Sequence, residues 1–130
     1  LIGFDLVKEQ GVLDAAYDDA LGITAAFNLN LLNIVRRELA ATVRIEDFRH
    51  IAFFNAAASR IEMHLEARHT TTVRWPGGER RFIAGERIHT EHSYKYTVAG
   101  ASELLEQTGF RELRWWTDPQ HWFALCWAQA

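Results

Sequence analysis

Cysteine and long apolar runs are scarce in this chain of 130 residues. The single cysteine, Cys126, lies in the apolar stretch WFALCW, so neither an internal disulfide bond nor a metal site with several thiolates can form. This usage fits a reducing cytoplasm. No stretch reaches the roughly 18 apolar residues that cross a bilayer, and the first residues lack the charged start of a signal peptide. We therefore predict a cytoplasmic protein without a membrane partner.

An excess of positive charge is also missing. The chain has 14 basic and 17 acidic residues, which are mixed along its length and give a net charge of -3. A nucleic-acid backbone is usually bound by a basic stripe or patch. Because the sequence offers neither, we expect no nucleic-acid partner.

The usual signatures of hydrolases and nucleotide-binding loops are absent as well. There is no GxSxG motif and no glycine-rich phosphate loop, and apolar surroundings raise the pKa of the Cys126 thiol instead of activating it. Three carboxylates, Glu62, Glu66 and Glu91, fall on predicted strands, but their spacing does not pair them as an acid and a base. No residue is nominated as a catalytic nucleophile.

Apolar residues make up 48% of the sequence, enough for one compact domain with a core. The aliphatic run LIGFDLV predicts a buried strand with Asp5 near its end. The next stretch predicts a helix that ends near Gly22 and has an apolar face formed by Leu13, Ala16, Tyr17 and Ala20. Thr24 is then the expected cap of a second helix, whose inward stripe is formed by Phe27, Leu31, Ile34 and Val35.

The apolar period changes to two after His50. In RIEMHLEAR, residues 60–68, the apolar side chains Ile61, Met63, Leu65 and Ala67 alternate with polar ones. This pattern predicts a half-buried antiparallel strand. The stretch WPGGERR predicts a turn at Pro76, Gly77 and Gly78, and residues 81–83 and 86–96 are predicted as further strands.

The last segment predicts a helix followed by two strands. Thr97 is the expected N-cap of a helix with Ala101, Leu104 and Leu105 toward the core, and Gly109 and Phe110 mark its end. RELRWWTD and HWFALCWAQ then form two strands joined by residues 118–120. The mixture of elements indicates an α/β fold, or α+β for this piece of chain.

The most polar stretch is ERIHTEHSYKYT, residues 86–97. On a regular strand the period of two places five hydrogen-bonding side chains on one face, namely Arg87, His89, Glu91, Ser93 and Lys95. The other face carries Ile88, Thr90, His92, Tyr94 and Tyr96. Such a polar row suits either a face in contact with water or the wall of a polar pocket.

A metal site is disfavoured by the same geometry. His89 and His92 are three residues apart, so on a strand they face opposite sides and can share an ion only across a bulge. The helical HExxH arrangement is absent, and the other four histidines are scattered singly. We predict no metal ligand in this chain.

Five stretches in order carry a resemblance to a known family: GFDLVK, AAYDDALGITAAFNLNLL, SRIEMHL, GERIHTEHSYKYT and GFRELRWWTDPQHWFAL. They resemble the C-terminal part of the histidine-specific, S-adenosylmethionine-dependent methyltransferases, which methylate the α-amino group of L-histidine in ergothioneine biosynthesis. The resemblance covers essentially the whole chain. It implies the end of a Rossmann-like class I methyltransferase sheet with an inserted, largely antiparallel substrate-binding subdomain.

The resemblance also implies roles for five residues. Glu91 and Ser93 are similar to the family pair that hydrogen-bonds the imidazole of bound histidine. Tyr17 resembles the tyrosine that contacts the substrate carboxylate, Met63 resembles the apolar wall beside the imidazole, and Thr24 is a weaker substrate-binding candidate. Both Tyr17 and Met63 also satisfy an apolar periodicity, so a purely structural role is open for them.

The resemblance further implies residues 1–22 and 98–130 as methyltransferase core and residues 23–97 as the substrate-recognition insertion. The family's glycine-rich nucleotide turn has no counterpart in these residues, so S-adenosylmethionine would bind mostly outside them. The chain starts at Leu1 inside an apolar run, and we expect it to be part of something longer. Alone it would be inactive, and surfaces exposed by truncation would favour self-association.

Two alternatives stay open at this point. The chain could be a stand-alone module that binds an amino acid without catalysis, since its composition suits a folded domain. It could also belong to a related methyltransferase with another amino acid or an indole compound as substrate, because a change in one pocket residue can redirect specificity.

Overall fold

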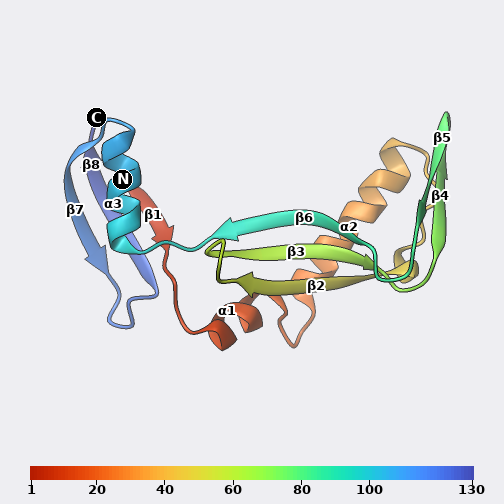
Figure 1. Cartoon of the computed structure of the whole chain (residues 1–130), viewed down its shortest axis with the longest axis horizontal. Coiled ribbons are helices and arrows are strands. Elements are labelled where there is room, and N and C mark those ends of the chain that lie inside the picture. The colour runs from red at the N-terminus through yellow and green to blue at the C-terminus, as the bar shows by residue number, and fades with distance from the viewer.

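The computed structural model describes all 130 residues as an elongated α+β molecule with a small sheet at one end and a larger one in the middle (Figure 1). The terminal sheet has the order β1-β8-β7, is antiparallel throughout, and is built from β1 (Ile2–Asp5), β7 (Arg111–Thr117) and β8 (Phe123–Gln129). Helix α3 (Val98–Gln107) covers one face of it. The coarse α+β class predicted for the chain is confirmed.

The central sheet has the antiparallel order β2-β3-β6. Its strands are β2 (Phe48–Asn55), β3 (Arg60–Ala67) and β6 (Arg87–Tyr94). One face is covered by α1 (Gln10–Tyr17) and α2 (Ile23–Glu38), and a short 3-10 helix, Ile45–Asp47, leads into β2. A hairpin of β4 (Thr71–Trp75) and β5 (Gly78–Phe82) stands at the far end of the molecule (Figure 1). No helix is both long enough and apolar enough to cross a membrane.

Three separate apolar clusters hold these parts together. The largest lies between α2, the central sheet and the hairpin, and it includes Leu32, Phe48, Leu65, Val73 and Phe82. A second lies under α3 in the terminal sheet, and a small third one joins Leu13 of α1 to Ile61 and Met63 of β3. The chain therefore has no single continuous core.

Most predicted strands and turns are confirmed. The strand at residues 60–67, the two strands at the C-terminal end and the hairpin turn at Pro76-Gly77 are all present, and Gly77 has a φ of 99°, which glycine adopts without strain. Helix α3 begins as predicted, since the Thr97 hydroxyl accepts a hydrogen bond from the Gly100 N–H at 3.0 Å. It ends before Gly109, but Leu104 faces solvent instead of the core.

The first two helices differ from the prediction. Helix α1 ends at Tyr17 and not near Gly22, and Ala16 and Ala20 are exposed. Thr24 does not cap α2: the Asp19 carboxylate accepts the backbone N–H groups of Ile23 and Thr24 at 3.0 and 2.8 Å. These backbone hydrogen bonds lower the pKa of Asp19 to about 2.

The inward stripe of α2 was also predicted wrongly. Phe27, Leu31 and Ile34 are exposed, whereas Leu32 is buried and Asn28 is fully buried. The Asn28 amide donates hydrogen bonds to the His64 carbonyl and to the His50 ring. A buried polar side chain with partners thus sets the rotation of the helix, and sequence hydropathy gives no sign of this.

A β-bulge at Thr90 changes which side chains of β6 share a face. Met63 pairs with Glu91, but the next residue, His64, pairs with His89, so Thr90 has no partner on β3. Its hydroxyl donates to the Met63 carbonyl at 2.9 Å. An extra residue in one strand moves all side chains on one side of the bulge to the opposite face of the sheet, compared with a regular strand.

The bulge corrects the predicted polar row. Glu91 and Ser93 lie on the face of Ile61 and Met63, toward α1, whereas Arg87 and His89 lie on the opposite face with Glu62, His64 and His92. The prediction that His89 and His92 face opposite sides was therefore wrong. It assumed a strand without a bulge, and a lone threonine gives no sequence signal for one.

The bulge predicts a stabilising role for the Thr90 hydroxyl. We expect Thr90→Val to lower the free energy of unfolding by about 1 kcal/mol, because the Met63 carbonyl loses its side-chain donor, while Thr90→Ser leaves it nearly unchanged. Urea denaturation of both variants measures this. Equal losses in the two variants would show that the hydroxyl does not stabilise the bulge.

Candidate functional site

Four of the five predicted site residues gather where α1 meets the central sheet. Tyr17 is the last residue of α1, Met63 lies on β3, and Glu91 and Ser93 lie two residues apart on β6. The Tyr17 hydroxyl donates a hydrogen bond to Ser93 Oγ at 3.0 Å, across 76 residues of sequence. Met63 and Glu91 are direct cross-strand partners. The fold therefore brings these four side chains together from three separate elements.

Lys95 is the residue of this group to which the sequence assigned no role. Its side chain is completely buried, and its ammonium donates to Ser93 Oγ at 2.8 Å and to the Tyr17 hydroxyl at 3.0 Å. The same ammonium forms an ion pair with Asp5 at 2.8 Å. Asp5 is the last residue of β1, so Lys95 connects the terminal sheet to the predicted site. The period-two pattern had placed Lys95 beside Ser93 and was the only sequence signal for it.

Lys95 and Asp5 stabilise each other's charged form. Burial alone would lower the pKa of Lys95, but its hydrogen bonds to Asp5 and Tyr17 outweigh burial and raise it above the ordinary value. Burial would raise the pKa of Asp5, and the hydrogen bonds from Lys8 and Lys95 overcome this and lower it. Lys95 is therefore a cation, and Asp5 an anion, throughout the neutral range.

The end of α1 is held in place by a chain of buried polar groups. His50 Nε2 lies 2.9 Å from the Tyr17 carbonyl, which can only accept, so Nε2 carries the proton. His50 Nδ1 then accepts from the Asn28 amide at 2.9 Å. Asp14 adds a tie from α1 to β2 by accepting the Phe54 N–H at 2.8 Å. These contacts fix the position from which Tyr17 reaches Ser93.

Glu91 and Thr24 differ from the other predicted residues. Glu91, for which the resemblance implies a hydrogen bond to a bound imidazole, is exposed on the edge strand β6, and its carboxylate makes no hydrogen bond. Thr24 is half-buried in the first turn of α2, and no hydrogen bond joins it to Tyr17, Met63 or Ser93. Met63 is buried among Leu13 and Ile61, which satisfies a packing role.

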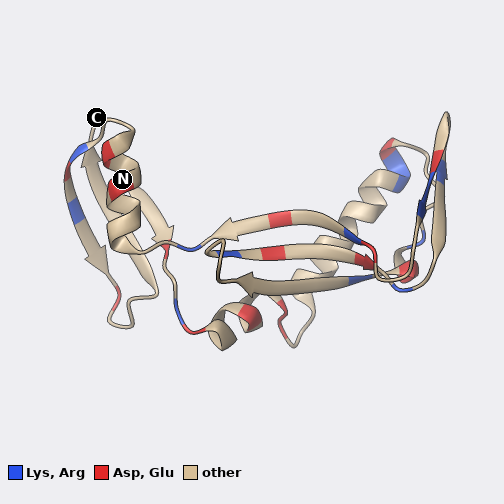
Figure 2. Ribbon diagram, in the orientation of Figure 1, with Lys and Arg blue, Asp and Glu red and all other residues tan.

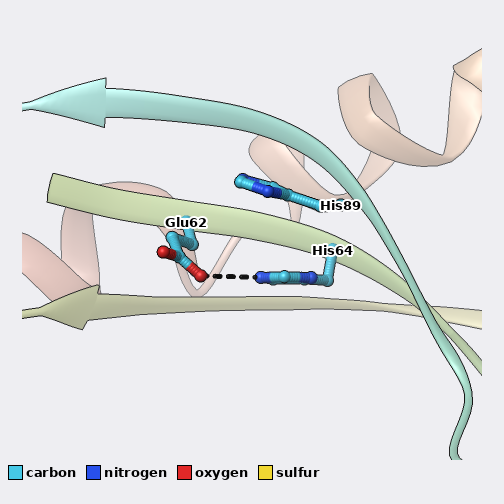
Figure 3. Close-up of side chains that lie close together, drawn as sticks. All are labelled: Glu62, His64 and His89. Carbon is cyan, nitrogen blue, oxygen red and sulfur yellow. Dashed lines mark hydrogen bonds and ion pairs between the residues drawn. The ribbon is translucent and has the colours of Figure 1, made fainter. Parts of the chain in front are cut away.

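The opposite face of the central sheet carries a second cluster, formed by Glu62, His64 and His89 (Figure 3). One ligand atom from each lies within 4.8 Å of the others. His64 Nε2 donates to Glu62 at 3.2 Å, and the Arg60 guanidinium holds the other oxygen of that carboxylate at 2.7 Å. The Arg60 hydrogen bonds are the main cause that lowers the pKa of Glu62 to about 2.

The ring geometry of this cluster does not suit a metal ion. The His64 and His89 rings stack with centroids 4.7 Å apart and planes only 18° from parallel. Figure 3 shows the two rings lying side by side in nearly parallel planes. Imidazole lone pairs lie in the ring plane, so two stacked rings cannot both point at one ion. Both Nε2 atoms are also engaged, with Glu62 and with the Glu91 carbonyl. Phe53 extends the stack on the other side of His64.

Figure 2 shows a few acidic and basic positions on the strands of the central sheet. Glu66 is buried between Arg49 and Arg87, and their hydrogen bonds lower its pKa, the bond from Arg87 being the largest cause. These ion pairs give the buried Glu66 carboxylate its hydrogen-bond partners within the sheet.

The surface cavities lie away from the predicted site. An apolar cavity of about 210 Å³ lies between α2, the hairpin and β6, lined by residues such as Leu32, Trp75 and Ile88. Two further hollows lie in the terminal part of the chain, one by Phe110 and one by Trp116. None is lined by Tyr17, Met63, Glu91 or Ser93, so the exposed Glu91 lies on an open surface in this chain.

Comparison with known proteins adds a family to this geometry. Residues 1–130 match the family model described as histidine-specific methyltransferase, SAM-dependent. The histidine N-alpha-methyltransferase of Mycolicibacterium smegmatis is 45% identical over 127 residues, which are 96% of this chain and 40% of that protein. The protein of the same name from Mycobacterium tuberculosis is 41% identical over 127 residues, with the same coverage. The chain thus spans 40% of the length of these relatives.

The link between Lys95 and Asp5 predicts a pH-dependent loss of stability. We expect Asp5→Asn to lower the free energy of unfolding by about 1.5 to 3 kcal/mol at neutral pH, the value of a hydrogen bond to a charged group. The pKa of Asp5 is lowered by folding, so its contribution is present above the unfolded value of 3.8 and is lost as pH falls through the folded value. The difference between wild type and variant should therefore vanish only in acid.

Urea denaturation at pH values from neutral to acid measures this difference. Asp18→Asn is the matched control, since Asp18 is exposed and its side chain makes no hydrogen bond or ion pair. A gap between Asp5→Asn and wild type that persists unchanged in strong acid would contradict the ion pair as its cause.

Proposed function

The chain belongs to the family of histidine-specific, SAM-dependent methyltransferases, and from that premise we propose that it recognises the substrate in an enzyme that methylates the α-amino group of L-histidine. The observation that carries the proposal is the convergence of Tyr17, Met63, Glu91 and Ser93 from three elements. Both curated relatives are named for this activity. The reaction would belong to ergothioneine biosynthesis in the cytoplasm.

The side chains have the chemistry that recognition of an imidazole requires. The Glu91 carboxylate can accept a ring N–H, and the Ser93 hydroxyl can hydrogen-bond the second ring nitrogen. Met63, their neighbour on β3, is buried against α1 and would add apolar surroundings beside the ring. An amino acid without a ring N–H would leave Glu91 unpaired once the site closes, which disfavours its binding.

Methyl transfer from a sulfonium is a direct displacement and needs no enzyme nucleophile. The enzyme has to hold the neutral amine of the substrate in line with the methyl group. This agrees with the lack of any activated nucleophile in the sequence. Residues of this chain would contribute by fixing the substrate side chain at one end.

S-adenosylmethionine would supply the methyl group, but the residues of this chain do not form a site for it. No helix begins directly after β1 and packs on the terminal sheet, because the chain leaves Asp5 through an extended link to α1 on the central sheet. A helix N-terminus after a glycine-rich turn is what a Rossmann-like fold uses to hold the nucleotide. We place the cofactor in the remaining part of the enzyme.

The exposure of Glu91 also supports a site that is completed by the remaining part of the enzyme. Ligand pockets usually bury most of the ligand surface, whereas Glu91 is exposed and no cavity adjoins it. The relatives are more than twice as long as the stretch that this chain matches. We propose that further residues of the enzyme close over Glu91 and Ser93.

The terminal sheet fits the edge of a larger Rossmann-like sheet. β1 and β7 run parallel because each is antiparallel to β8 between them, and β1 pairs on one side only. The face of this sheet away from α3 exposes four large apolar side chains: Trp116, Phe123, Leu125 and Trp127. In the complete enzyme other elements would cover this face, and in the isolated chain it would favour self-association.

The predicted division of the chain is retained with one addition. Residues 1–22 and 98–130 would belong to the methyltransferase core and residues 23–97 to the recognition insertion. Helix α1, which lies in the first of these segments, contacts β2 and β3 of the central sheet. We therefore propose that it acts with the insertion.

The role of Glu91 can be tested in the complete enzyme. We expect Glu91→Gln to lower kcat/KM for histidine by about five- to 150-fold, because about 1 to 3 kcal/mol attaches to an unsatisfied hydrogen-bonding group. Mass spectrometry of mono-, di- and trimethylated histidine measures the turnover, and Glu103→Gln on the exposed side of α3 is the control. Undiminished turnover by Glu91→Gln would refute the assigned role.

Substrate class is settled by competition among histidine, tryptophan and tyrosine in the same assay. We expect only histidine to be methylated, because neither other ring offers a donor and an acceptor on two separated nitrogens. Preferential methylation of tryptophan would instead support an enzyme for an indole substrate. Heat released when the isolated chain is titrated with millimolar histidine would favour a stand-alone binding module.

The apolar face of the terminal sheet, which we propose is covered in the complete enzyme, gives a separate prediction. We expect Leu125→Lys to destabilise the complete enzyme by at least about 2 kcal/mol, because a charge would then lie within an apolar contact. The isolated chain, in which Leu125 is exposed, should tolerate the same change. Thermal unfolding of both proteins, with Glu103→Lys as control, measures the difference, and a complete enzyme that tolerates Leu125→Lys would exclude this docking face.

A further inference from the structure

The hydrogen bonds around Ser93 limit what its hydroxyl can still do. Lys95 Nζ lies 2.8 Å from Ser93 Oγ, and the Tyr17 hydroxyl lies 3.0 Å from it. A serine hydroxyl has two acceptor lone pairs and one proton to donate. The ammonium of Lys95 has no lone pair, so it can only donate. At least one lone pair of Ser93 Oγ is therefore occupied permanently.

The second lone pair is occupied by Tyr17. The Tyr17 oxygen itself accepts from Lys95 at 3.0 Å, which strengthens its O–H as a donor. A phenol is also a stronger acid than an alcohol, so between the two hydroxyls the phenolic proton points to the serine. Ser93 is left with both lone pairs in use and one free proton.

We propose that Lys95 and Tyr17 restrict Ser93 to the role of hydrogen-bond donor, so that the site accepts only a neutral imidazole with its proton on the nitrogen that faces Glu91. The inference rests on the proposed function and deepens it. A carboxylate can only accept, and Ser93 in this network can only donate. One neutral tautomer of the imidazole satisfies both, and the imidazolium cation, with two donors, does not.

Lys95 acts in this network as a positioning residue, since it reaches the substrate through Ser93. Its ion pair with Asp5 and its hydrogen bond to Tyr17 keep it, despite its burial, in the charged form that only donates. The other ionisable groups at this contact are Tyr17 on α1 and Lys8, which shares Asp5. Its positive charge also lies close to the second ring nitrogen and opposes a cation there.

The proposed network also restricts the hydroxyl of Tyr17. Its single proton serves Ser93 and is not available at the same time to a substrate carboxylate. The contact with the carboxylate that the family resemblance implies would require the phenolic proton to turn away, which would free one lone pair of Ser93. Tyr17→Phe should therefore weaken the selection for neutral imidazole and keep Lys95 in place.

The test is the pH dependence of ligand binding to the complete enzyme, measured by calorimetry. An unperturbed imidazole has a pKa near 6.5, so its neutral fraction falls about tenfold from about pH 7.5 to about pH 5.5. The triazole analogue of histidine keeps a neutral ring over this range and carries the same α-amine, so histidine should lose about ten times more affinity than the analogue does. A constant histidine affinity would overturn the proposal, and so would an equal fall for both ligands, since that would report the shared α-amine or a titrating group of the enzyme.

Two variants separate the proposed role from a merely structural one. Lys95→Met frees a lone pair of Ser93, so the fall in histidine affinity at low pH should flatten, whereas Lys95→Arg retains donors only and should keep it. Ser93→Ala should weaken both ligands by a similar factor. A methionine variant with the wild-type pH profile, or an arginine variant without it, would overturn the assignment to Lys95.

The proposed function can fail independently of this inference. A complete enzyme that binds no histidine at any pH would refute histidine recognition itself. If Lys95→Met does not fold, the comparison of histidine with its triazole analogue on the wild-type enzyme still decides whether the site selects the neutral ring.

Discussion

The buried contact between Lys95 and Asp5 is the interaction on which the arrangement of the whole chain depends. Only two segments connect the terminal and central sheets, and they run side by side at this contact (Figure 1). Their backbones are joined as well, since the Tyr96 N–H donates to the Asp5 carbonyl and the Val7 N–H to the Tyr96 carbonyl. With three separate cores and no shared apolar interface, the sheets have few other restraints on their relative position. In the proposed methyltransferase that position would set the distance between bound substrate and methyl donor, so the same contact would bear on structure and on catalysis.

The second constraint is the bulge at Thr90, which places the polar side chains before it and those after it on opposite faces of the sheet. Before the bulge, Arg87 and His89 complete a polar face of ion pairs and stacked rings. After it, Glu91 and Ser93 turn toward α1 and Tyr17. A regular strand would place His89 beside Glu91 on the recognition face, where a ring with its own donor and acceptor would compete with the substrate. Bulges commonly aim side chains in this way next to functional sites.

Local chemistry explains which features could be predicted from the sequence. The cap at Thr97 and the turn at Pro76-Gly77 depend on residues close together in the chain, and they are present as predicted. The half-buried alternation predicted for β3 is not, since Glu62 and Glu66 are buried like Ile61 and Met63. The rotation of α2 is different, because it follows from Asn28 bonding to His50 and His64, more than twenty residues away. Lys95 shows the same limit. Its place beside Ser93 follows from strand periodicity, but its partners Asp5 and Tyr17 come from the other end of the chain.

In the proposed enzyme, the groups that select the substrate and the residues that bury it would lie in different parts of the protein. The groups that distinguish an imidazole from other rings would lie on this chain, where backbone pairing to β3 fixes Glu91 and Ser93 in one register. Yet an exposed carboxylate keeps its water in the absence of ligand, and exchanging water for an imidazole N–H gains little free energy. Discrimination becomes large only when the carboxylate is desolvated, because an unpaired buried group then carries its full cost. Closure by the rest of the enzyme would thus act here by desolvating Glu91. It would convert hydrogen-bonding geometry that already exists on this chain into a specific choice of substrate.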